Sequence, residues 1–256
     1  MVVDLIIKAS SIITMDPDNP RVEAVAVDSS TGLISAVGSY SELQEAHSDA
    51  QVHDAGKTVL TPGLIDPHSH PALSGLSTQS PAHWIAPYVG FPTFDDVTAY
   101  FTKVNAETPA GVPVAFNGLD RILHNAPELT NTILDQYFPD RAVIVIDNSG
   151  HEVYFNTANI KLLGWEDGKP PADPVGARYG RNEDGTSNGR AYESAALLVA
   201  ASKVLASLAT HPLAPIAQWY KLMATNGITS TSEHTYASNQ FKAYVAMAMA
   251  PDSPLR

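Results

Sequence analysis

Between residues 112 and 232, short apolar runs alternate with segments that have the composition of helices. Every position of the run 142–146 (Ala-Val-Ile-Val-Ile) is apolar, which is typical of a parallel strand covered on both faces. Similar strand-like runs occupy 112–116 and 227–232. This alternation predicts an α/β fold based on a parallel sheet or a (β/α) barrel. The predicted helices cover residues 94–105, 130–137, 157–163, 194–208 and 214–225.

The first 61 residues have a different pattern, in which short strands and tight turns replace the helices. The runs 23–27 and 33–37 are rich in Val, Ile and Ala, and they flank the polar turn 28–32, which ends in glycine. Two such runs around a glycine-containing turn predict a β-hairpin. We therefore predict that residues 1–61 are the N-terminal part of a small β-sandwich domain.

Residues 62–256 are predicted to form the first half of a (β/α)₈ TIM-type barrel. A complete barrel needs about 250 residues, whereas His68 to Arg256 supplies 189. The stretch 165–190 is rich in Gly, Pro, Asp and Asn, which predicts a long loop insertion over a site.

Composition limits the kinds of partner that the chain can bind. Hydrophobic residues make up 44% of the chain and charged residues 16%, so a sizeable core is expected. The formal net charge of −12 repels phosphate backbones and anionic lipids, so we expect neither nucleic acid nor a membrane as partner. No signal peptide and no run of 18 apolar residues is present, which makes a cytoplasmic location the expectation. The chain has no cysteine, so a metal ion would need His, Asp, Glu or a modified Lys.

A pair of histidines is the clearest chemical signal. The stretch Leu64-Ile-Asp-Pro-His-Ser-His70 predicts a short strand that ends in polar residues. Side chains two positions apart leave a strand on the same side, so His68 and His70 can face one point. Neutral imidazole is a good ligand for Zn²⁺. Asp66 lies on the same side and is the candidate to orient a ligand from behind. Taken alone, a His-x-His pair is more often two surface histidines in a loop than a metal site.

The residues around this pair resemble a known family. The stretch Pro62-Gly-Leu-Ile-Asp-Pro-His-Ser-His70 resembles the PGhIDxHxH signature of the amidohydrolase superfamily. Asn148-Ser-Gly-His-Glu-Val-Tyr-Phe-Asn156 and Gly189-Arg-Ala-Tyr-Glu193 resemble the GHxxxxN and GxxxE stretches of amidohydrolase family 3, which includes N-substituted formamide deformylase-like enzymes. Gly227-Ile-Thr-Ser230 is similar to the GhTs strand of that branch. The stretches follow the family's order along nearly the whole chain.

The resemblance implies a metal-dependent hydrolase of carbon–nitrogen bonds in amides or formamides. His68 and His70 would bind the more buried of one or two divalent ions, with zinc expected, and the ion would lower the pKa of a water molecule toward 7. Glu193 is the candidate for a carboxylate ligand and for a catalytic role, because Lys161 and Lys203 lie in helix-like runs. The alternative for Glu193 is an acid that favours a helix N-terminus.

Further candidates follow predicted strands. His151 is a candidate catalytic and substrate-contacting residue, with an ordinary loop histidine as the alternative. Asn156 and His124 are candidate substrate contacts, although Asn156 could equally cap the next helix. Glu233 and His234 end the fourth predicted strand and could face the site, but no family motif fixes them.

This length and motif content predict a fragment of a longer enzyme that is inactive alone. A complete member supplies further ligands and a general base from later strands, which would lie beyond Arg256. The substrate would be a small amide-type molecule, and homo-oligomer formation by the full-length protein is left open. The alternatives are a non-catalytic amidohydrolase-like scaffold that acts through assembly, and a deaminase or dihydropyrimidinase-like member of the same superfamily.

Overall fold

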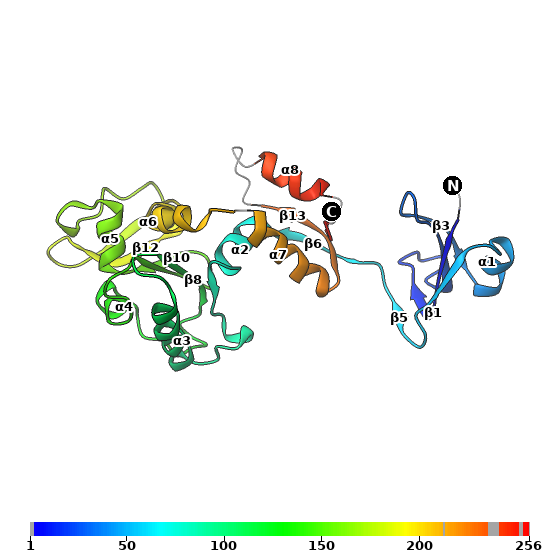
Figure 1. The fold of residues 1–256 in the computed structure, drawn as a ribbon, viewed down its shortest axis with the longest axis horizontal. Helices are drawn as coiled ribbons and strands as arrows, with labels where there is room; N and C mark the ends of the chain where they lie inside the picture. The colour runs from blue at the N-terminus through cyan, green and yellow to red at the C-terminus, as the bar shows by residue number, and fades with distance from the viewer. Residues whose placement is uncertain (1–2, 212, 235–240, 251–252, 256) are drawn as a thin grey trace. The chain divides into compact units, whose positions relative to one another are not determined.

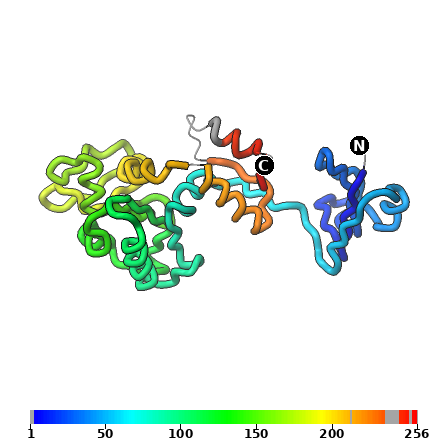
Figure 2. The backbone as a smooth tube through the Cα atoms, in the orientation of Figure 1, coloured from blue at the N-terminus to red at the C-terminus, as the bar shows by residue number. Residues whose placement is uncertain are grey.

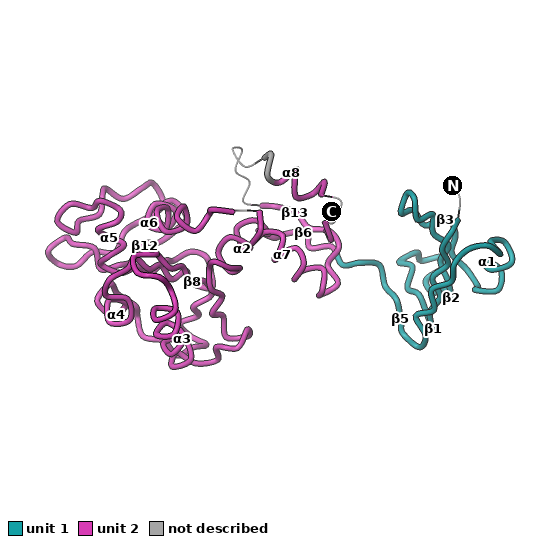
Figure 3. Tube along the Cα trace, in the orientation of Figure 1, with its two compact units in different colours: residues 1–64 teal, residues 65–256 magenta. Residues whose placement is uncertain are grey.

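The computed structural model describes residues 3–211, 213–234, 241–250 and 253–255. It divides into two compact units, Met1–Leu64 and Ile65–Arg256, which are coloured teal and magenta in Figure 3.

The first unit is a mixed five-stranded sheet with one helix. The strands run in the order β3-β2-β1-β4, and β5 also pairs with β1. The predicted hairpin is confirmed, because β2 and β3 pair antiparallel. The described part of this unit contains one sheet, with α1 packed on one of its faces, and the β-sandwich domain to which it would contribute stays a prediction. The elements are β1 (Leu5–Ile13), β2 (Arg21–Asp28), β3 (Leu33–Gly38), α1 (Tyr40–Ala46), β4 (Gln51–Asp54) and β5 (Val59–Leu60).

The cover of this sheet follows from its alternating side chains. Leu43 of α1 packs against Ile6, Ala24 and Ala26, which all lie on the same face of the sheet. Ser39 begins the helix by accepting a hydrogen bond from the Glu42 N–H. One capped helix with a buried leucine is therefore enough to cover this face.

The second unit contains a six-stranded sheet in the order β11-β12-β10-β9-β8-β7 (Figure 1). The β7, β8 and β9 strands are parallel, whereas β10, β12 and β11 continue the sheet antiparallel. The strands are β7 (His83–Trp84), β8 (Val114–Leu119), β9 (Val143–Asp147), β10 (Glu152–Phe155), β11 (Arg178–Arg181) and β12 (Ser187–Tyr192).

Helices cover both faces of this sheet, as the continuous apolar run in β9 predicts. Val143 and Val145 lie in one core cluster with α3 and α4, and Ile144 and Ile146 lie in another with α5 and α6. The helices and 3₁₀ turns of this part are η1 (Pro87–Val89), α3 (Phe94–Glu107), α4 (Asn131–Tyr137), α5 (Thr157–Leu163), η2 (Glu166–Gly168) and α6 (Glu193–Leu208). The predicted helices are thus confirmed within one or two residues at each end.

A separate two-stranded sheet joins β6 (Leu64–Ser69) to β13 (Ile228–Glu233). Figure 2 shows α7 leading into β13, which lies beside β6. Helix α2 (Pro71–Thr78) follows β6 and packs closely on α7 (Leu213–Thr225). The glycine at position 75 allows this close approach, since a Cβ there would stand 2.7 Å from the Ile216 Cα. The last helix is α8 (Phe241–Met249).

Two predictions about this unit differ from the structure. The four predicted barrel strands do not share one sheet in the described residues, because β6 and β13 pair with each other while β8 and β9 lie in the larger sheet. The predicted loop 165–190 contains β11 and four of the six residues of β12. The second difference has a local cause: a tight turn with Gly150 at φ +74° returns the chain from β9 into the antiparallel β10, to which β12 and then β11 add.

Within the described residues, no single helix combines the length and the apolar character needed to cross a membrane; the sharply bent pair α6 and α7 meets that test only when both helices are counted together.

Candidate functional site

His68 and His70 come from the end of β6, where the strand passes into α2. Pro71 occupies the first turn of α2, where the missing N–H of proline removes no hydrogen bond, and His70 is the residue before it. The local sequence therefore ends the strand and starts the helix at the two histidines. The side chain of His70 is 43% exposed, and His68 is exposed.

The two imidazoles are neighbours, as their spacing predicts. Their ring centroids lie 5.8 Å apart and the ring planes are nearly perpendicular. A ring that binds Zn²⁺ at about 2.0 Å from its nitrogen has its centre about 3 Å from the ion, so two rings on one ion stand roughly 5–6 Å apart. The observed separation of His68 and His70 fits this range.

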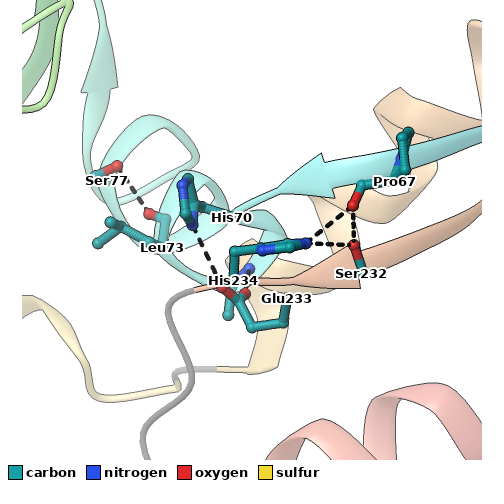
Figure 4. Close-up of polar contacts among 8 residues, drawn as sticks. Pro67, His70, Leu73, Ser77, Ser232, Glu233 and His234 are labelled. Carbon is teal, nitrogen blue, oxygen red and sulfur yellow. Dashed lines mark hydrogen bonds and ion pairs between the residues drawn. The ribbon is translucent and has the colours of Figure 1, made fainter.

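Glu233, at the end of β13, lies beside His70 (Figure 4). Its Oε1 atom is 3.8 Å from His70 Nδ1, and its Oε2 accepts a 2.9 Å hydrogen bond from the Ala72 N–H in the first turn of α2. Its side chain is only 15% exposed. The pairing of β6 with β13 thus brings together residues that are more than 160 positions apart.

His234 adds a third imidazole. Its ring stacks on His68 at 4.3 Å with the planes almost parallel. Its Nε2 lies 2.9 Å from the Pro67 carbonyl and 3.0 Å from Ser232 Oγ. A carbonyl can only accept, so this nitrogen is the donor in the hydrogen bond to Pro67. The sequence placed Glu233 and His234 at a strand end, but only the strand pairing shows that they adjoin His68 and His70.

Asp66 contacts the backbone of the first histidine. Its Oδ1 accepts a 3.2 Å hydrogen bond from the His68 N–H. This contact supports the turn of the chain into the histidine pair, and an orienting role of Asp66 toward a metal ligand stays a prediction.

Glu193 and His151 form a second pair on the six-stranded sheet, where Glu193 directly follows β12 and His151 directly precedes β10. Glu193 Oε2 lies 2.8 Å from His151 Nδ1, and the Glu193 N–H donates to the His151 carbonyl at 2.8 Å. Because a carboxylate accepts, Nδ1 is the donor in this hydrogen bond, and Nε2 is the ring nitrogen that Glu193 does not contact. Both side chains are more than half exposed. The two residues that the sequence singles out are therefore brought to each other.

His124 and Asn156 are buried. His124 is 2% exposed, and its Nδ1 accepts from the Asp120 N–H at 2.9 Å, which holds the loop after β8. Asn156 is fully buried; its Oδ1 accepts from the N–H groups of Val143 and Asn159, and it caps α5. The cap is the alternative that the sequence left open for Asn156. In this structure neither side chain is exposed for contact with a substrate.

The donor set at the end of β6 suits a divalent ion in part. The imidazoles of His68 and His70 have the chemistry and the spacing of zinc ligands, and the Glu233 carboxylate lies 3.8 Å from His70 Nδ1. No group of three or more His, Asp or Glu side chains in the described part of the chain is placed to hold one ion, and Glu193 therefore does not join the histidine pair there. The two histidines fit as two of the ligands of a metal site.

Comparison with known proteins shows which family the chain resembles. A model of the amidohydrolase family matches residues 51–256. The chain is 31% identical over 201 residues to the N-substituted formamide deformylase of Arthrobacter pascens, which covers 77% of this chain and 35% of that protein. It is 29% identical over 107 residues to a 5-methylthioadenosine/S-adenosylhomocysteine deaminase of Nitratidesulfovibrio vulgaris, covering 40% of this chain and 24% of that protein. The chain thus spans about a third or less of the length of these relatives.

A solved structure is similar in fold. A metal-dependent hydrolase of Pyrococcus horikoshii OT3, described as uncharacterized, matches with a TM-score of 0.63 and 14% identity over 98% of this chain and 47% of that one. This likeness supports the fold alone. The family model, which matches well over half of the chain, and the deformylase, which matches 77% of it, show that the chain belongs to the amidohydrolase family.

Proposed function

We propose that the chain contributes His68 and His70 to the metal site of a hydrolase that cleaves carbon–nitrogen bonds in small non-peptide amides or formamides. The observation that carries the proposal is the 5.8 Å spacing of the two rings at the end of β6. A divalent ion, with zinc as the proposed species, would be held in part by these two imidazoles and would supply Lewis-acid activation of water and of a carbonyl group.

The chain's own residues have separate tasks in this proposal. His68 and His70 are the ligands, and Asp66 fixes the backbone from which they project. Because three protein ligands are usual at catalytic zinc, at least one more ligand is needed besides the pair. His151 is proposed to contact substrate through Nε2, because Glu193 occupies its other nitrogen. A cytoplasmic location and a substrate that is neither nucleic acid nor lipid remain part of the proposal.

Metal analysis of single variants tests the ligand assignment. The purified chain, loaded with Zn²⁺ and desalted, should lose most of its bound metal in His68→Ala and in His70→Ala. His53→Ala is the matched control, since it removes an exposed histidine on β4 of the first unit. Metal content equal to that of the unchanged chain in both variants would contradict the proposal, and it would favour a non-catalytic scaffold.

A deaminase is the second candidate, because a relative of that activity also matches the chain. In both reactions water cleaves a carbon–nitrogen bond, but the products that can be measured differ. Release of formate from N-alkyl formamides supports the formamide reading, and release of ammonia from aminopurine nucleosides supports the deaminase. The panel is run on the metal-loaded protein, with His70→Ala as the inactive control.

A further inference from the structure

We propose that Glu233 is a positioning residue for His70, so that its carboxylate fixes which ring nitrogen of His70 is left to bind metal. The inference rests on the proposed function, because it assigns a role toward the same ion. It concerns a residue that no sequence motif marks.

The first argument is placement. Glu233 Oε1 faces Nδ1 of His70 at 3.8 Å, within ion-pair range but longer than a hydrogen bond. Hydrogen bonds at catalytic sites are often long without ligand and shorten when the ligand binds. A histidine that binds metal through one nitrogen almost always donates its other N–H to a carboxylate, a carbonyl or water. Glu233 is placed to accept that N–H.

The second argument is that the carboxylate is held from its other oxygen. Oε2 accepts the Ala72 N–H at 2.9 Å, which leaves Oε1 on the side of His70. Ala72 is two residues beyond His70, so the contact ties the carboxylate to the helix that begins at the histidine. A side chain that is 15% exposed and fixed in this way has little freedom to turn away.

The third argument is the charge of the surroundings. Burial raises the pKa of Tyr220, and the negative charge of Glu233 adds to that rise. Tyr220 therefore stays a neutral phenol beside Glu233 at physiological pH. The charged group that lies at ion-pair distance from the carboxylate, in the described part of the chain, is the His70 ring when it is protonated, with Nδ1 at 3.8 Å.

Two variants separate positioning from a purely structural role. Glu233→Gln keeps an oxygen that can accept the Ala72 N–H but removes the charge, whereas Glu233→Ala removes both. Glu152→Gln is the matched control, because Glu152 is 17% exposed, close to the 15% of Glu233, but pairs with Arg190 instead of a histidine.

The experiment titrates each variant of the whole chain with Co²⁺ and follows its visible absorption. It also reads the His70 tautomer of the metal-free protein by two-bond ¹H–¹⁵N correlation. We expect Glu233→Ala to weaken Co²⁺ binding by about 10- to 100-fold and to shift the ring proton from Nδ1 to Nε2. Glu233→Gln should show a smaller loss of affinity at an unchanged metal-free melting temperature. Glu152→Gln should change the melting temperature alone.

Each other outcome counts against the proposal. Co²⁺ affinity within twofold of the unchanged chain in Glu233→Ala overturns it, whatever the tautomer. A weaker affinity with an unchanged His70 tautomer also overturns it, because the effect would then be structural. If His68→Ala and His70→Ala bind Co²⁺ normally, the proposed function itself fails, so the two failures are distinguishable.

Discussion

Glu193 Oε2 and His151 Nδ1 lie 2.8 Å apart, although 42 positions separate the two residues in the sequence. The contact is made by a glutamate with φ of +66°, a conformation that residues with a Cβ rarely adopt. A main-chain hydrogen bond from the Glu193 N–H to the His151 carbonyl also joins the two residues. Strained residues of this kind gather at functional sites, which makes the pair worth testing beside the histidines of β6.

The strain at Glu193 predicts an inverted order of two substitutions. In a helix, alanine normally makes the fold more stable than glycine does, by about 1 kcal/mol. At position 193 we expect Glu193→Gly to be the more stable by about 1 kcal/mol, because alanine keeps the left-handed strain and glycine does not. Urea unfolding of the two variants measures this, and the usual order would show that the backbone relaxes elsewhere.

Asn156 is expected to be a structural residue. Its amide accepts the Val143 and Asn159 N–H groups and donates to the Phe138 and Arg141 carbonyls. Asn156→Ala should lower the free energy of unfolding by at least about 3 kcal/mol, because it leaves several buried groups unpaired.

Asn148→Ala, in an exposed loop, is the control for this experiment and should stay within about 0.5 kcal/mol of the unchanged chain. A folded, fully stable Asn156→Ala protein that has lost only substrate affinity would instead restore the substrate contact that the sequence suggests.

Gly189 is expected to tolerate no side chain. It has φ of +80°, and a Cβ would stand 2.3 Å from the Phe155 carbonyl oxygen and 2.5 Å from the Asn131 nitrogen. We expect Gly189→Ala to cost about 3 kcal/mol or more by thermal or urea unfolding, from overpacking added to backbone strain. Gly185→Ala has a similar φ of +83° in open space, so it should cost only about 1–2 kcal/mol. Equal costs at the two sites would rule out the steric explanation.

His83 should make the fold less stable in mild acid. Burial lowers its pKa below 6.5, so the folded state resists protonation while the unfolded chain accepts it. Above pH 6.5 both states are neutral, and stability falls as the pH drops from 6.5 to the lower pKa of the folded state. The melting temperature of the unchanged chain should therefore fall more between pH 8 and pH 5 than that of His83→Gln. Parallel pH profiles of the two proteins would contradict this.

Much of the fold follows from local sequence. The apolar run of β9 forces coverage of both faces, and α3, α4, α5 and α6 supply that coverage because their own patterns are amphipathic or apolar. Thr93 and Thr130 cap α3 and α4, and the hairpin of β2 and β3 turns at Gly32. Local signals of this kind depend on near neighbours in the chain, so they can be recognised without the fold.

The sequence by itself determined that His68 and His70 project side by side, because a spacing of two along a strand fixes direction. Only the tertiary structure decided that Glu233 and His234 adjoin them, that His151 meets Glu193, and that His124 and Asn156 are buried. Those outcomes depend on which strands pair over long separations. Strand pairing is set by the burial of whole sheets against helices, which no single motif encodes.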